Sequence, residues 1–92
     1  MTTSDSAICR KVVEMFGADL QQMVAIEEIG ELLQAISKRA RGKDNRDNLA
    51  EEIADVEIML EQLKHIHKCH GEVDHWKEKK LMRLCGRIEE RR

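Results

Sequence analysis

Four acidic side chains form two pairs with a spacing of three residues, Glu28 with Glu31 and Glu52 with Asp55. Residues three apart lie on the same face of an α-helix, so each pair can direct both carboxylates to one point. Carboxylate oxygens are the ligands that suit hard divalent cations such as Mg²⁺ or Mn²⁺. The two pairs therefore predict a divalent-cation site, provided that their helices bring them together.

The composition favours the helices that such a site needs. The chain has 92 residues, 37% of them charged, with no proline and only one phenylalanine and one tryptophan. Straight-chain residues lose little rotamer freedom in a helix, and two aromatic side chains fill little core. We therefore predict one all-α domain over residues 1–92, an antiparallel helical bundle of about four helices whose core is completed by homo-oligomerisation.

Glycines and caps divide the chain into the predicted helices. Gly17, Gly42 and Gly71 suit helix ends, and Asp44 or Asp47 can cap the third helix. The predicted helices span about 6–15, from 18 or 19 to 40, from the Asp44 or Asp47 cap to about 68, and about 72–91. The loop between the second and third helices is short, so we expect these two helices to pack antiparallel.

This antiparallel hairpin would place the two acidic pairs at similar heights. At a rise of about 1.5 Å per residue, Glu31 lies about 15 Å from the turn and Glu52 about 12 Å from it. On the third helix, Glu52 falls inside the apolar sector and Asp55 lies at its edge. That sector comprises Leu49, Ile53, Val56, Met59, Leu60, Leu63 and Ile66, while the predicted solvated face holds Glu51, Glu57, Glu61 and Lys64.

The second helix shows the pattern less sharply. Glu28 and Glu31 flank its main apolar face, and the small side chain of Ala35 beside them leaves room for an ion. That apolar face comprises Ala25, Ile29, Leu32, Leu33, Ile36 and Ala40. Unpaired carboxylates in this position would repel one another, so they need a cation. The residues alone leave two choices open, namely a bound metal or ion pairs with Lys or Arg of a neighbouring helix or subunit.

The segments Glu27-Glu28-Ile29-Gly30-Glu31-Leu32 and Glu51-Glu52-Ile53-Ala54-Asp55-Val56 resemble the ExxE and ExxD motifs of the MazG-like all-α nucleoside triphosphate pyrophosphohydrolases. Twenty residues separate Glu31 from Glu52. The resemblance extends over roughly residues 19–90 and includes the segments 41–45 and 80–84. It implies that Glu28, Glu31, Glu52 and Asp55 hold Mg²⁺, with Mn²⁺ as a substitute, and that water cleaves a nucleoside triphosphate into a monophosphate and pyrophosphate.

Other residues receive roles that follow from this reading. Glu27 is a candidate for activating water, although an ordinary solvated glutamate explains it equally well. Lys80 and Arg83 on the last helix are candidates for binding phosphate. Alternatively, their aliphatic stems cover the core while their charged groups remain in solvent. Gln21 shares the Glu28 stripe and is a candidate nucleotide contact. Alternative functions are a phosphoribosyl-ATP pyrophosphohydrolase and a non-catalytic helical dimerisation module.

Charge, hydropathy and the spacing of cysteines and histidines argue against several other classes of function. A net charge of −2 with interspersed signs lacks the basic footprint of a nucleic-acid binder, and no apolar run is long enough for a membrane span. We expect a cytoplasmic homodimer or homotetramer with three free cysteines. His65, His67, Cys69 and His70 match no zinc spacing, so we interpret the histidines as favourable charges at a helix C-terminus.

Overall fold

The computed structural model describes residues 1–91 and consists of helices joined by short turns. They are α1 (Thr3–Phe16), α2 (Ala18–Ala40), α3 (Arg46–His67) and α4 (His70–Glu90), and no strand occurs in the described residues. The prediction of an all-α protein with about four helices is confirmed.

Two of the three helix ends differ in detail from the prediction. Gly17 (φ 92°) separates α1 from α2 as expected, and Gly42 (φ 89°) lies in the turn after α2. However, the residue that caps the end of α3 is Lys68, which adopts a left-handed conformation with φ 52°, whereas Gly71 lies inside α4. The residue before α3 is Asn45 rather than Asp44 or Asp47, and its amide Nδ2 donates to the carbonyl of Ala35 over 3.1 Å. This bond ties the start of α3 to α2.

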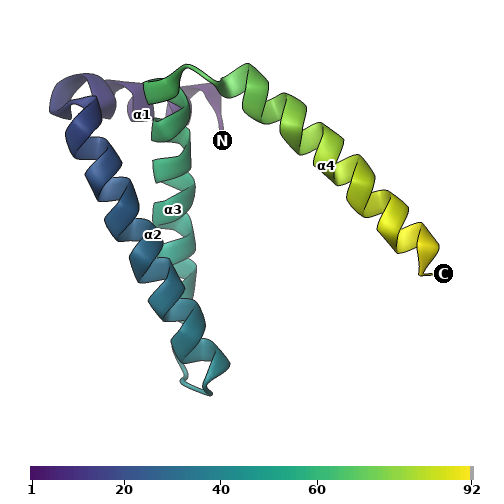
Figure 1. Ribbon diagram of the computed structural model, residues 1–92. Helices are drawn as coiled ribbons and strands as arrows, with labels where there is room; N and C mark the ends of the chain where they lie inside the picture. The colour runs from purple at the N-terminus through teal and green to yellow at the C-terminus, as the bar shows by residue number, and fades with distance from the viewer. Residues whose placement is uncertain (92) are drawn as a thin grey trace.

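Helices α2 and α3 form the antiparallel hairpin, and α1 lies across the end of it that is remote from the turn (Figure 1). Helix α4 leaves that same end and projects away from the hairpin (Figure 1). Its only helix–helix contacts are with α3, and every residue from Asp74 to Glu90 is exposed. The predicted bundle is therefore incomplete within one chain, because α4 does not pack alongside α2 and α3.

The core of the hairpin is small and unusually polar. Its buried apolar side chains are Cys9, Ala25, Ala35, Val56 and Met59, and its buried polar side chains are Gln21, Glu52, Glu61 and Gln62. None of the large side chains is fully buried. Because apolar burial is the main driving force for folding, this core contributes little stability for a chain of this length.

The face that α2 turns towards α3 agrees only in part with the face predicted from the sequence. Gln21, Ala25 and Ala35 are buried there, with Glu28 and Leu32 half-buried between them. Ala25 and Leu32 belong to the predicted apolar face. Its other large side chains are in solvent, with exposed fractions of 37% for Ile29, 63% for Leu33 and 48% for Ile36. On α3, Ile53 and Leu60 are also exposed. We call these five side chains the apolar row.

The lengths and hydropathies of the helices bear on whether the chain can span a membrane. In residues 1–91 none of them is both long enough and apolar enough to cross a bilayer.

Candidate metal centre

The contact between α2 and α3 brings the acidic pairs together. Carboxylate oxygens of Glu28, Glu31 and Glu52 all lie within 4.8 Å of one another, and Glu51, Glu52 and Asp55 form a second group with the same spacing. Glu52 belongs to both groups and is the most buried of these side chains, with 8% exposure. The helices therefore supply four carboxylates, two from each, around Glu52; we call Glu28, Glu31, Glu52 and Asp55 the carboxylate cluster.

Two oxygens of this cluster are buried and unsatisfied. The Oε2 atoms of Glu28 and Glu52 have no hydrogen-bond partner. Among the described residues, the ion pairs involve other carboxylates, those of Glu14, Asp44 and Glu61. A buried carboxylate without a cationic partner is costly, because it has lost its hydration and gained nothing in exchange. Within the part of the chain that the structure describes, the alternative of ion pairs with Lys or Arg has no support.

The crowding of like charges raises the pKa of two members of the cluster. Burial is the main cause of the raised pKa of Glu28, followed by the charges of Glu31 and Asp55. Burial is again the main cause for Glu52, whose pKa is also raised by Glu31 and Asp55. These shifts mean that the chain alone does not stabilise the fully ionised cluster.

A divalent cation matches this arrangement. It would supply the missing positive charge, accept the two orphaned Oε2 atoms as ligands, and lower the raised pKa values of the carboxyls. The donor set consists of oxygens only, which is the set preferred by hard cations. The residues present therefore fit a metal of this class.

The other predicted site residues are not gathered around the cluster. Glu27 is exposed on α2 beside Glu28, and nothing covers it within the chain. Gln21 is buried between the helices, where its amide Nε2 donates to Oε1 of Gln62 over 2.8 Å. Lys80 and Arg83 are exposed on α4, a helix that makes no contact with α2.

Sequence reasoning missed one group of side chains that the fold brings together. Glu61 was predicted on the solvated face of α3, but it is only 6% exposed and contacts His65 and His70. The reason is that α1 packs on this side of α3 and brings the hydroxyl of Ser6 to within 2.6 Å of Glu61. The i, i+4 spacing of Glu61 and His65 was visible in the sequence, whereas the approach of α1 and of His70 was not.

Comparison of the chain with protein-family models, with curated proteins and with solved structures gave no match. The similarity to a pyrophosphohydrolase family consequently rests on the two acidic motifs. What the site can do has to be argued from its geometry and charge.

Proposed function

We propose that this protein is a Mg²⁺-dependent nucleoside triphosphate pyrophosphohydrolase. The observation that supports this most strongly is the carboxylate cluster, which has two buried oxygens without partners and, among residues 1–91, no ion pair with a basic side chain. A structural cluster of this kind would be expected to contain Lys or Arg. The two acidic motifs resemble those of the MazG-like enzymes, and the cluster is built from those same residues.

In this proposal the four carboxylates of the cluster hold Mg²⁺, and Glu27 accepts a proton from the attacking water. Bound Mg²⁺ supplies charge neutralisation for the triphosphate and orients its leaving group. The net reaction adds one water across the anhydride bond between the α and β phosphates. It yields a nucleoside monophosphate and pyrophosphate, with the released proton leaving through Glu27 to solvent. The exposure of Glu27 suits this exchange of protons.

We further propose that the active form is a homodimer or homotetramer. The apolar row on α2 and α3 is exposed in the single chain, and apolar rows of this length favour association of helices. Lys80 and Arg83 lie on α4, which contacts α3 but not α2, so they are not placed at the carboxylate cluster of their own chain. In an assembly they would bind the triphosphate at the cluster of a second copy, where their charges would complement the phosphates.

The decisive experiment is a substrate screen. Purified protein is incubated with Mg²⁺ and a panel of ribo- and deoxyribonucleoside triphosphates, damaged nucleotides and phosphoribosyl-ATP, and pyrophosphate and monophosphate are quantified together. Equal amounts of the two products are expected for at least one nucleotide. Release of orthophosphate instead would show that a different bond is cleaved, and the absence of any product would refute the enzymatic function.

The substitution Glu52→Gln tests the assigned site. It removes a charge without changing the shape of the side chain, so turnover is expected to fall by at least about 100-fold while helix content is unchanged. Glu57→Gln is the matched control, because it makes the same change at an exposed position on the same helix. If both variants kept normal turnover, the cluster would not be the catalytic centre.

A second candidate function is a non-catalytic helical dimerisation module, which the exposed apolar row favours. The two candidates differ in their response to metal. Binding to the folded state alone raises the melting temperature by mass action. The enzyme should therefore be stabilised by millimolar Mg²⁺ or Mn²⁺, and this stabilisation should disappear in Glu52→Gln. A dimerisation module would associate without responding to either metal.

A further inference from the structure

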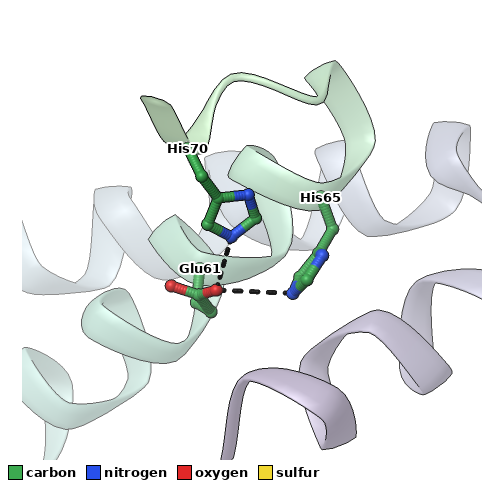
Figure 2. Close-up of side chains that lie close together, drawn as sticks. All are labelled: Glu61, His65 and His70. Carbon is green, nitrogen blue, oxygen red and sulfur yellow. Dashed lines mark hydrogen bonds and ion pairs between the residues drawn. The ribbon is translucent and has the colours of Figure 1, made fainter. Parts of the chain in front are cut away.

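A second group of ligand-type side chains lies at the opposite end of α3 from the hairpin turn. His65 is in the last turn of α3, and His70 is the first residue of α4. Both rings turn their Nε2 atoms towards Oε2 of Glu61, at 3.3 Å for His65 and 2.7 Å for His70 (Figure 2). The left-handed turn at Lys68 is what brings the two histidines to the same carboxylate.

These three side chains lie close enough together for each to offer one ligand atom to a single ion. With zinc–nitrogen and zinc–oxygen bonds of about 2.0–2.1 Å, tetrahedral ligand atoms lie about 3.3 Å apart. The observed group keeps all three ligand atoms within 4.8 Å of one another. His65 already has the required distance from Glu61, and His70 has to move by only a few tenths of an ångström.

The carboxyl group of Glu61 is held in its anionic form, which is the form that binds a metal ion. It is 6% exposed, and its pKa is lowered to about 2, chiefly by the hydrogen bond from the Ser6 hydroxyl and also by those from His70 and Lys64. Lys64 Nζ lies 3.3 Å from Oε1, whereas Ser6 and both histidines approach Oε2. One oxygen is therefore held by the lysine, and the other faces the imidazoles.

The group is also accessible. A cavity of about 530 Å³ opens beside it, lined by Glu61, His65 and His70 together with residues of α1 and of the first half of α4. Among its other lining residues are Ser6, Arg10, Asp74 and Lys77. An ion can reach the three ligand atoms through this opening, and a water molecule or an anion can occupy a fourth position.

We propose that Glu61, His65 and His70 bind Zn²⁺, with a fourth coordination position open to this cavity. Two imidazoles and one carboxylate are a donor set typical of zinc and unlike the oxygen-only set of the carboxylate cluster. In the metal-free chain, the same atoms form a hydrogen-bonded network in which His65 Nε2 also lies 2.9 Å from the Ser6 carbonyl and hydroxyl oxygens. On binding zinc, His65 would exchange these contacts for the metal.

This site would have a structural consequence. Its ligands come from α3 and α4, and Ser6 of α1 contacts two of them. Since α4 otherwise contacts only the end of α3, zinc would anchor the start of α4 to the hairpin. We therefore expect Zn²⁺ to raise the melting temperature of the whole chain.

The test is a Zn²⁺ titration of the full chain, freed of metal by chelation and held in millimolar Mg²⁺ to fill the carboxylate cluster. Competition with a chromophoric chelator measures the affinity, and Co²⁺ in place of Zn²⁺ reports tetrahedral coordination by its visible absorption. One ion per chain is expected. His70→Gln should weaken binding by at least about 100-fold and abolish the cobalt spectrum. The side chain of His70 is 40% exposed, so its replacement leaves no buried cavity.

Two controls make the result specific. His67→Gln changes a neighbouring histidine whose Nε2 contacts Gln22 rather than Glu61, and it should bind zinc like the wild type. Glu52→Gln should also keep zinc affinity, which separates this site from the proposed hydrolytic centre. Equal losses in His67→Gln and His70→Gln, or no saturable binding by the wild type, would leave a hydrogen-bonded network only and overturn the proposal.

Discussion

At Glu52, burial of the side chain conflicts with the negative charge of its carboxylate. It lies on the apolar sector of α3 and is buried, yet its Oε2 has no partner and its neighbours Glu31 and Asp55 repel it. Natural proteins keep such a conflict where it serves function. The position of this one side chain is thus the strongest residue-level argument for a bound cation.

This conflict predicts how stability depends on pH. The pKa values of Glu28 and Glu52 are raised above 4.5 in the folded state, so the stability they contribute is full below about pH 4.5 and is lost as the pH rises through the raised values. The substitution Glu52→Gln removes the loss of stability that ionisation of Glu52 causes. In metal-free buffer, the melting temperature of Glu52→Gln minus that of the wild type should increase from pH 4.5 to about pH 8.

Saturating Mg²⁺ provides the control for that measurement. It should raise the wild-type melting temperature most at the high-pH end, where the cluster is ionised, and leave Glu52→Gln nearly unchanged. A difference between the two proteins that stays constant with pH would contradict the assignment of unpaired charge to Glu52.

The contribution of Glu61 to stability should depend on pH in the opposite direction. Its pKa is lowered to about 2 by Ser6, His70 and Lys64, so its contribution is present above pH 4.5 and is lost as the pH falls towards 2. Glu61→Gln in chelator should destabilise the chain by about 1–3 kcal/mol at neutral pH, because a buried hydrogen-bonded network loses its acceptor charge. Urea unfolding measures this, and Glu57→Gln on the exposed side of α3 should change stability by no more than about 0.5 kcal/mol.

At the scale of elements, the turns depend on two glycines with positive φ. Gly42 (φ 89°) reverses the chain between α2 and α3, and a Cβ there would meet no atom within 4 Å. Gly42→Ala should therefore cost about 1–2 kcal/mol through backbone strain alone. Gly30→Ala is the matched control, since Gly30 lies in open space within α2, where alanine should stabilise by about 0.5–1 kcal/mol. In thermal unfolding, Gly42→Ala should lower the melting temperature and Gly30→Ala should raise it.

The whole molecule is more extended than its length requires. A compact chain of 92 residues has a radius of gyration of about 12 Å, whereas this one has 16.0 Å. The excess comes from α4, which projects from the hairpin (Figure 1). An extended arm together with an exposed apolar row and a small polar core is what we expect of a subunit that is completed by other copies.

Association can be tested at the apolar row. Leu33 is 63% exposed, so Leu33→Glu leaves the fold of the single chain intact and places a charge in the proposed interface. The variant should be monomeric at concentrations where the wild type is oligomeric, as measured by sedimentation equilibrium. Ile8→Glu, at a 62% exposed position on α1, should associate like the wild type. A wild-type chain that is monomeric at all concentrations would refute the oligomer.

The helices, the hairpin and the meeting of the two acidic pairs could all be predicted from the amino-acid sequence. These follow from local periodicity, from glycines at the turns and from the rise per residue of a helix. All three depend only on the order of residues along the chain. The sequence also showed that Glu52 lies on the packed side of α3. These are the features on which the carboxylate cluster depends.

The packed face of α2 and the positions of α1 and α4 depend instead on contacts between helices. On α2, Ile29 and Leu33 of the predicted apolar face are exposed, because the helix packs against α3 along Gln21, Ala25 and Ala35. The burial of Glu61 among His65 and His70 depends on α1 and on the Lys68 turn. Such contacts join residues far apart in the chain, and helical periodicity carries no information about them.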